Sequence, residues 1–196
     1  MTAPACLPRM TPMKLLPATA RQLLAGLLLA IGAATAMPQQ SPAFYTVEIV
    51  VFRAGSDTGA LPDNSPATVV NDDGIEATLV PTGKLGTAAN RLRARTSGYR
   101  VLAHVAWTQA PASFNSRRGV SAAQLGLAGS IAGKVVLERD QKLHLGVDLT
   151  IEDGGRRYHI EELRKDVRRD QIYYFDSPAV GVLAIITAAA APPAAG

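Results

Sequence analysis

The chain has 196 residues, 47% of them hydrophobic, and carries 20 lysines and arginines against 16 aspartates and glutamates. Three of the basic residues and none of the acidic ones precede residue 37, so the remaining 160 residues carry 17 minus 16, or +1. So small an excess offers no general electrostatic attraction to nucleic acid, and we expect no nucleic-acid partner.

Residues 1–36 have the order of a secretory signal peptide: basic residues, an apolar run, then a small-x-small cleavage site that ends at Ala36. The apolar run, residues 23–34, is shorter than the roughly 20 residues that a membrane span needs. The sequence therefore predicts cleavage after Ala36 and no stable membrane insertion afterwards. Cys6 would leave with the signal, so the mature chain would have no disulfide and no thiol nucleophile.

The first predicted element is a strand over residues 44–53, FYTVEIVVFR, with apolar side chains on both faces. Tyr45 and Val47 would point to one face and Val50 to the other, a pattern typical of a strand inside a sheet. Residues 54–81 are rich in Gly, Pro, Asn, Asp, Ser and Thr. We expect them to form a long irregular connection, of the kind that is usually functional or mobile.

A helix is predicted over residues 84–96, with Thr82 as its N-cap and Gly98 just beyond its end. Its apolar side chains recur at helical spacing and form one stripe: Leu85, Ala88, Ala89 and Leu92. An arginine cluster falls in its last turns, where cations suit the helix dipole. We interpret this cluster as a solvated helix end rather than as a ligand site.

A second clear strand is predicted over residues 99–109, YRVLAHVAWTQ. Strict alternation places five of its side chains on one face: Tyr99, Val101, Ala103, Val105 and Trp107. Residues 114–128 resemble a loop, and this loop carries Arg117 and Arg118.

Three further strands are predicted over residues 130–138, 142–152 and 157–167, although the apolar residues of the last also fit a helical stripe. One helix and about six strands, mostly joined by short turns, indicate an α+β fold. We expect one antiparallel sheet with the helix on one face. This single domain would span residues 37–187, and a disordered tail would follow over residues 188–196.

Near the C-terminus a strand-like stretch is broken by Asp176-Ser177-Pro178. Proline has no N–H for a sheet ladder, so a central strand cannot run straight through it. We interpret this stretch as a structural corner between two strands. Tyr173 and Tyr174 would point to opposite faces, which predicts that one of them is exposed and either stacks on a glycan or simply packs at a sheet edge.

Catalytic and metal-binding motifs are not apparent. His104, His144 and His159 lie on separate predicted strands, and isolated histidines of this kind are more often ordinary surface or core residues than metal ligands. The sequence has no G-x-S-x-G motif, no Gly-rich phosphate loop and no zinc motif. We therefore expect no metal, no cofactor and no enzymatic activity.

Four segments resemble, in the same order, the CsiV family, periplasmic proteins of Gram-negative bacteria described as peptidoglycan-binding. They are YTVEIVVFR (45–53), YRVLAHVAWTQ (99–109), KLHLGVDL (142–149) and YYFDSPAVGVLAIIT (173–187). The resemblance implies a periplasmic protein that supports cell-wall synthesis. Its implied partners are peptidoglycan, an outer-membrane lipoprotein and the penicillin-binding protein that this lipoprotein activates.

The last segment departs from the family pattern, because Gln171, Tyr173 and Ser177 stand where the family usually has a glutamate and two histidines. Any ligand that those histidines hold would not transfer to this chain. The family's corner residues remain: Tyr174, Asp176, Pro178 and Gly181.

Recognition of peptidoglycan needs aromatic faces for sugar rings and polar groups for peptide carboxylates. Candidates in and after the middle strand are Tyr99, Arg100, His104, Trp107, Arg117 and Arg118. The apolar face on which Trp107 lies predicts a core position for it equally well. Three hypotheses remain open at this point, and we give them in decreasing order of preference. The chain is a peptidoglycan-binding accessory protein, an envelope adaptor that binds proteins, or a wall hydrolase whose catalytic residues converge only in the fold.

Overall fold

The computed structural model describes residues 44–55 and 73–192. The predicted signal peptide lies outside these residues, as do most of the predicted connection (56–72) and the last four residues.

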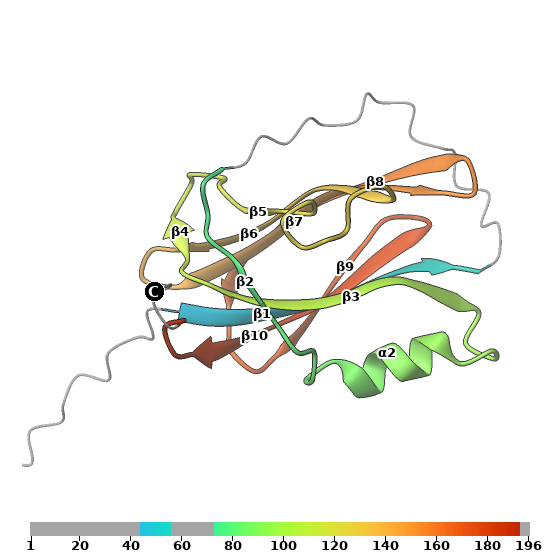
Figure 1. Cartoon of the computed structure of the whole chain (residues 1–196), viewed down its shortest axis with the longest axis horizontal. Coiled ribbons are helices and arrows are strands. Elements are labelled where there is room, and N and C mark those ends of the chain that lie inside the picture. Colours follow the sequence, from blue (N-terminus) through green and yellow to red (C-terminus); the bar gives the residue numbers. More distant parts are fainter. Residues whose placement is uncertain (1–43, 56–72, 193–196) are drawn as a thin grey trace, which may run out of the picture. The chain divides into compact units, whose positions relative to one another are not determined.

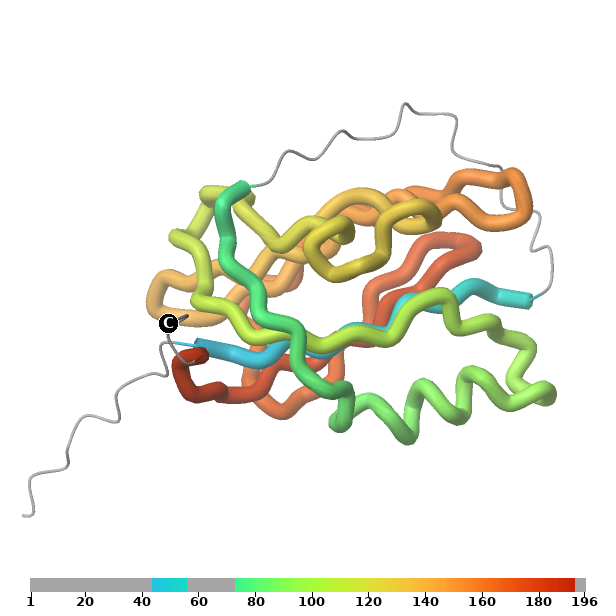
Figure 2. Tube along the Cα trace, viewed as in Figure 1, coloured from blue at the N-terminus to red at the C-terminus, as the bar shows by residue number. Residues whose placement is uncertain are grey.

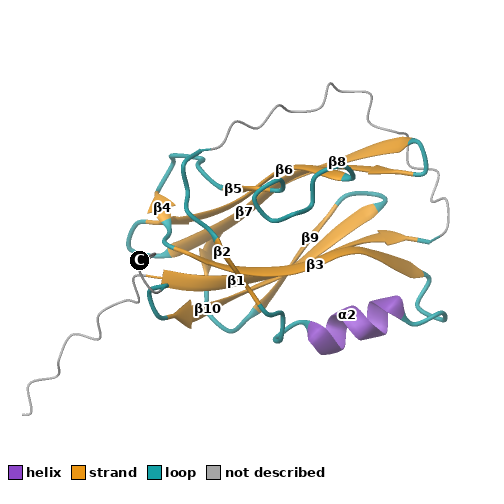
Figure 3. Cartoon of the chain, in the orientation of Figure 1, coloured by secondary structure: helices purple, strands orange, loops and turns teal. Residues whose placement is uncertain are grey.

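The described residues form a single helix and ten strands in two sheets, which Figures 1 and 3 show as two layers. The elements are β1 (Phe44–Ala54), β2 (Thr78–Val80), α2 (Gly86–Arg93), β3 (Tyr99–Gln109), β4 (Ala112–Ser113), β5 (Val120–Ser121), β6 (Ile131–Arg139), β7 (Leu143–Asp153), β8 (Arg156–Val167), β9 (Ile172–Asp176) and β10 (Val180–Ala189). The helix and the mainly antiparallel strands confirm the α+β prediction, but the expectation of a single six-stranded sheet is wrong.

Sheet A has the strand order β2-β3-β1-β10-β9 and is antiparallel throughout. Sheet B has the order β4-β6-β7-β8, with β5 also paired to β6; only the short β4–β6 pairing is parallel. The second sheet arises because β6, β7 and β8 pair only with one another and with the short strands β4 and β5. The central position predicted for β1 is confirmed, since it lies between β3 and β10.

The main core lies between the two sheets, whose traces run one above the other in Figure 2. Val47 and Ile49 of β1 meet Leu145 and Leu149 of β7 in one buried cluster, as in a face-to-face sandwich. Alternation therefore works as expected along both strands: the residues that point inward are apolar and almost completely buried.

A β-bulge changes the alternation of β3. Val51 pairs with Ala103 and Phe52 with Val101, so Leu102 has no partner residue in β1. The extra residue shifts the start of the strand to the opposite face. The prediction that Tyr99 shares a face with Ala103 and Trp107 is therefore wrong, and the same holds for Val101.

The alternatives for residues 157–167 are settled in favour of a strand, since β8 pairs with β7 along its length. Two features produce the helix-like spacing. Leu163 pairs with Gly146 and is 43% exposed, so it lies on the face of β8 opposite to the buried Ile160. Val167 pairs with Leu143 and Arg164 with Leu145, so β8 contains an extra residue there, and Asp166 has a positive φ of 58°. This extra residue returns Val167, seven residues after Ile160, to the buried face.

The Asp-Ser-Pro stretch forms the turn of the β9–β10 hairpin, in which Asp176 pairs with Gly181. The backbone N–H of Ser177 donates to the Val180 carbonyl at 2.8 Å and closes the turn. The predicted corner between two strands is confirmed. Strand β10 continues through Ala189, so the predicted tail begins at least two residues too early.

Two predicted loops also contain strand. Residues 78–80 of the predicted connection form β2, which pairs with the far end of β3. Residues 120–121 of the predicted 114–128 loop form β5 on β6. Both strands have only two or three residues, too few to show a period of two.

Candidate functional site

The outer face of sheet A, which is the face turned away from sheet B, is only partly covered. Helix α2 packs on it through Leu85 and Ala89, which contact Val50 and Ile185 in a second, smaller apolar cluster. Beyond the helix the sheet remains open to solvent. Figure 1 shows α2 on the side of sheet A opposite to sheet B.

Three aromatic side chains, Tyr99, Phe52 and Tyr174, form what we call the aromatic platform on this outer face. The Phe52 ring lies at the centre and is 6% exposed, whereas Tyr99 and Tyr174 are 47% and 48% exposed. The Tyr99 ring meets the Phe52 ring edge-on, with ring centroids 5.3 Å apart. The Tyr174 ring is stacked on the Phe52 ring, with centroids 6.2 Å apart and an angle of 13° between the ring planes. Each tyrosine thus keeps about half of its surface free beside a fixed neighbour.

The backbone creates this platform in two ways. The bulge at Leu102 turns Tyr99 to the outer face, where it reaches Phe52. Gly181 leaves space for the rings of Phe52 and Tyr174. A Cβ atom at this position would lie 2.6 Å from the Phe52 ring and 2.9 Å from the Tyr174 ring. Gly181 is therefore required for close packing of these two rings.

The platform also has polar groups. Partial burial, and then the nearby Asp176 and Tyr99, raise the pKa of the Tyr174 hydroxyl above its ordinary value. The hydroxyl therefore stays protonated at neutral pH and can both donate and accept a hydrogen bond. Asp176 is exposed and adds a carboxylate acceptor at the edge of the same face. Flat aromatic surface beside such groups is suited to a ligand with an apolar face and hydroxyl groups.

Helix α2 is fixed next to the platform by a buried carboxylate. Glu48 accepts hydrogen bonds from the backbone N–H groups of Gly83, Lys84 and Leu85 at 3.1, 2.8 and 3.0 Å. His104 Nε2 lies 2.7 Å from the same carboxylate and, since an ionised carboxylate can only accept, donates to it. The predicted N-cap Thr82 is wrong, because this distant glutamate satisfies the free N–H groups before the helix.

The ionised form of Glu48 is favoured in this position. Burial, the largest single influence, raises the pKa of Glu48, but the hydrogen bond from His104 and the three backbone hydrogen bonds together bring it below its ordinary value. A negative charge close to the start of a helix also suits the helix dipole.

The other end of α2 is tied directly to the platform. The Ser97 hydroxyl donates to the Leu92 carbonyl at 2.6 Å and accepts from the backbone N–H of Tyr99 at 3.1 Å. The helix ends at Arg93, three residues earlier than predicted, and Gly98 (φ 71°) lies in the turn that follows. The position of Tyr99 thus depends on α2.

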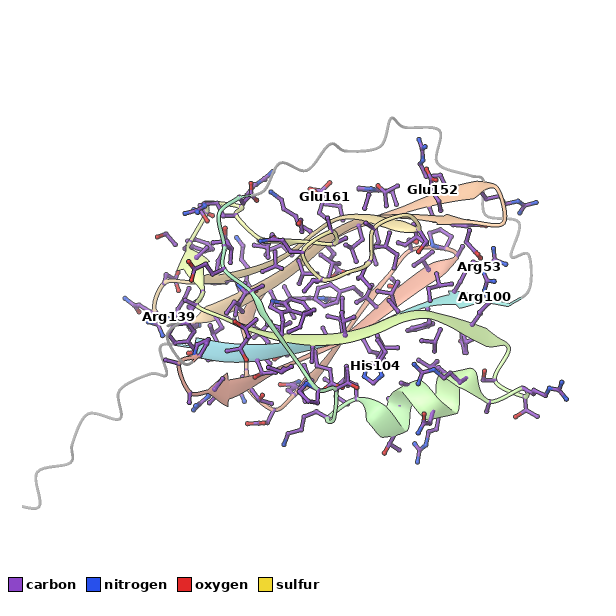
Figure 4. The ribbon with its side chains drawn as sticks, viewed as in Figure 1. Arg53, Arg100, His104, Arg139, Glu152 and Glu161 are labelled. Atoms are coloured by element: carbon purple, nitrogen blue, oxygen red, sulfur yellow. The ribbon has the colours of Figure 1, made fainter. Side chains whose placement is uncertain are left out.

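The structure separates most of the residues that the sequence suggested as ligand-binding. Trp107 is completely buried in the main core, where its indole Nε1 donates to Gln109 Oε1 at 2.6 Å. His104 is enclosed between sheet A and α2, as Figure 4 shows. Arg100 points to the inner side and forms an ion pair with Asp153 of β7. Only Tyr99 belongs to the platform.

Arg117 and Arg118 lie on a loop that belongs to sheet B. Glu138 is buried and holds this loop by accepting from the backbone N–H groups of Asn115 and Arg117. The Arg118 side chain donates to the backbone carbonyl of Asp73. Arg118 is therefore tied to Asp73, the backbone at Arg117 is held by Glu138, and neither arginine belongs to the platform.

Phe52 was missed as a site residue, whereas Tyr174 was named as a corner residue and, together with Tyr173, as an alternative for glycan stacking. The prediction that either Tyr173 or Tyr174 is exposed is confirmed for Tyr174, whereas Tyr173 packs against the main core. Alternation along β1 gives Phe52 the same face as Val50. No local signal shows that these side chains meet Tyr99, since their contact depends on strand pairing and on the bulge.

Within residues 44–55 and 73–192, no group of three or more His, Cys, Asp or Glu side chains is arranged to hold a metal ion. Over the same residues, no helix has the length and apolar character needed to cross a membrane. Comparison of the chain with protein-family models, with curated proteins and with solved structures finds no match.

Proposed function

We propose that this protein is a non-catalytic periplasmic protein that binds peptidoglycan through the aromatic platform. The observation that carries the proposal is the pair of half-exposed tyrosines, Tyr99 and Tyr174, on either side of the buried Phe52 ring. A sugar ring has a flat face of C–H groups and a rim of hydroxyl groups. Aromatic rings bind the face, and the Tyr174 hydroxyl and the Asp176 carboxylate bind the rim.

The fold suits a passive binding role. Exposed aromatic rings on a strand surface are rigid, because the sandwich core below them fixes the backbone. Two rings on one face can contact neighbouring sugars of one chain, so a repetitive polymer would be bound better than a single sugar. The resemblance to the CsiV family points to the same ligand and adds two proposed partners, an outer-membrane lipoprotein and a penicillin-binding protein.

Co-sedimentation with purified sacculi tests the proposal. The purified protein is mixed with sacculi at increasing salt and centrifuged, with an unrelated periplasmic protein as the control. We expect salt-resistant pelleting with no soluble wall fragments in the supernatant. Release of muropeptides would instead indicate a hydrolase, and failure to pellet would contradict direct wall binding.

A second candidate function is an envelope adaptor that binds another protein. It is favoured by Ile172 on the edge strand β9, which is 51% exposed and lies on the same outer face as Tyr174. Exposed aliphatic side chains next to aromatic ones are typical of protein interfaces. Pulldown of the proposed lipoprotein partner in the absence of glycan, weakened by Ile172→Ala, would favour this function over wall binding.

A further inference from the structure

Helix α2 and the residues next to it carry a row of cations, which we call the α2 cations: Lys84, Arg91, Arg93 and Arg95. All four residues are exposed. The side chains of Leu85, Ala89 and Leu92 pack on sheet A, so the charged groups lie away from the packed stripe of the helix. Figure 1 shows α2 as the outermost of the described elements on this side of sheet A.

The α2 cations have no acidic partner within residues 44–55 and 73–192, where the ion pairs involve other side chains. Arg93 Nη1 donates to the neutral amide oxygen of Asn90 at 3.4 Å. The sequence explains this, because it has no aspartate or glutamate between Glu76 and Glu138 but eight lysines and arginines. The positive charge of α2 is therefore not neutralised by ion pairs with its neighbours.

The interpretation of the arginines as a solvated helix end accounts for only part of this charge. A helix places roughly half a negative charge at its C-terminal end, which a single cation offsets. Arg95 also lies beyond the helix, because Ala94 has an extended backbone with ψ 136° and ends it. The excess guanidinium groups are suited to an external anion, whose oxygen atoms match their planar fork.

The shape of α2 indicates what kind of anion this is. Its eight residues make a helix about 12 Å long. Lys84 precedes the helix and Arg95 follows it, so the α2 cations extend over more than one small anion can contact. Small ligands and single polymer chains are usually held in clefts or grooves, whereas α2 protrudes from the sheet. A protruding row of cations fits a flat surface that carries many anions.

We propose that α2 docks the protein on a membrane surface that contains anionic phospholipids, with the α2 cations paired to the lipid phosphates. Several lysines and arginines on one amphipathic helix are suited to anionic headgroups. The contact is peripheral, since the apolar stripe of α2 stays packed on sheet A. This inference is independent of the proposed function, because it does not use the aromatic platform.

The test measures flotation of the purified protein, without the predicted signal peptide, with lipid vesicles. One kind of vesicle contains phosphatidylcholine alone, and the other contains equal parts of phosphatidylcholine and phosphatidylglycerol. The test variant combines Arg91→Gln, Arg93→Gln and Arg95→Gln. The matched control combines Arg117→Gln, Arg168→Gln and Arg169→Gln, which removes the same charge from three exposed arginines elsewhere. Thermal melting confirms that both variants are folded.

We expect the wild type to float with the anionic vesicles but not with the neutral ones, and to be released as salt is added, because exposed charges are screened. The α2 variant should bind the anionic vesicles about a hundredfold more weakly, as expected for the loss of three cations near an anionic surface. The control variant should bind as the wild type does.

Several results would overturn the inference. They are equal flotation of the wild type with both kinds of vesicle, binding that resists salt, unchanged binding of the α2 variant, and an equal loss in the control variant. Release by inorganic phosphate, but not by chloride at the same ionic strength, would indicate a discrete phosphate site instead of a membrane surface.

Pelleting with sacculi separates this inference from the proposed function. The α2 variant should still pellet with sacculi as the wild type does. If it loses pelleting while its vesicle binding is unchanged, the α2 cations bind the wall and the membrane assignment is wrong. If the wild type floats with anionic vesicles but never pellets with sacculi, the membrane surface stands and the proposed function fails.

Discussion

The two faces of sheet A are made by the same strands and have different roles. On the inner face, side chains such as Val47 and Trp107 are completely buried against sheet B. On the outer face, helix α2 covers one part, while Tyr99 and Tyr174 remain half exposed on the other. Phe52 on β1 thus supports a solvent-facing aromatic surface, while its neighbour Val51 belongs to the core.

Strand alternation therefore separates the side chains that stabilise the fold from those that are accessible to a ligand. A side chain on the inner face contributes mainly through burial, at about 25 cal/mol for each Å² removed from water. A tyrosine on the outer face buries less and contributes less to folding, yet only such a residue can touch a ligand. Substitutions on the two faces should therefore affect different measurements.

The strongest destabilisation should come from a substitution on the inner face. Trp107→Ala should lower the free energy of unfolding by about 3–5 kcal/mol, because it removes the largest fully buried side chain and leaves a cavity. It also leaves the Gln109 amide without its indole donor. Denaturant unfolding measures the change. A loss below about 1 kcal/mol would contradict the core position of Trp107.

The next effect concerns the link between α2 and sheet A. Glu48→Gln should lower the free energy of unfolding by about 1–3 kcal/mol at neutral pH, since charged hydrogen bonds to three N–H groups and to His104 are weakened. The folded-state pKa of Glu48 lies below its ordinary value of 4.5. The ionised carboxylate therefore adds its full stability at pH values above 4.5. This contribution is lost as the pH falls through the folded-state pKa.

Unfolding measured from neutral to acid pH separates this carboxylate from the others. The difference between wild type and Glu48→Gln should shrink as the pH falls. Glu161→Gln, at an exposed position of β8, is the control and should follow the wild type throughout. A constant difference at every pH would mean that Glu48 acts through its shape rather than its charge.

A loss of stability of similar size is expected when a side chain is added beneath the rings of the outer face. Gly181→Ala places a Cβ atom against the rings of Phe52 and Tyr174, and such overpacking costs about 1–3 kcal/mol. Sacculus binding should fall as well, because the rings must move apart. Gly86→Ala, where nothing lies within 4 Å of the added atom, is the matched control. Equal stability and binding of the two variants would contradict the packing of the platform.

Local patterns predicted much of the fold. Alternation in the segments that became β1, β3, β6, β7 and β8 placed each of these strands to within about two residues, a normal boundary error. Short strands such as β2 carry no such period. The division into two sheets depends on pairing between distant segments, which local patterns do not show.

The candidate site was less predictable for the same reason. Tyr99 was identified, but on the wrong face, because a single extra residue at Leu102 reverses the alternation of β3. Trp107 was weighed equally as a core residue, and burial decides for the core. The hydrogen bonds between Glu48 and the start of α2 join residues far apart in the chain. Local sequence patterns therefore predicted Thr82, a neighbour in the chain, as the N-cap.

The most direct test of the central claim uses a variant that changes only the outer face. Tyr99→Ala combined with Tyr174→Ala should cost less stability than Trp107→Ala and leave the protein folded, since both tyrosine side chains are half exposed. Leu163→Ala, at an exposed apolar position of sheet B, is the control. We expect the wild type and the control to pellet with sacculi, and the folded double variant to remain in the supernatant. If the double variant pellets as the wild type does, the platform is not the wall-binding surface.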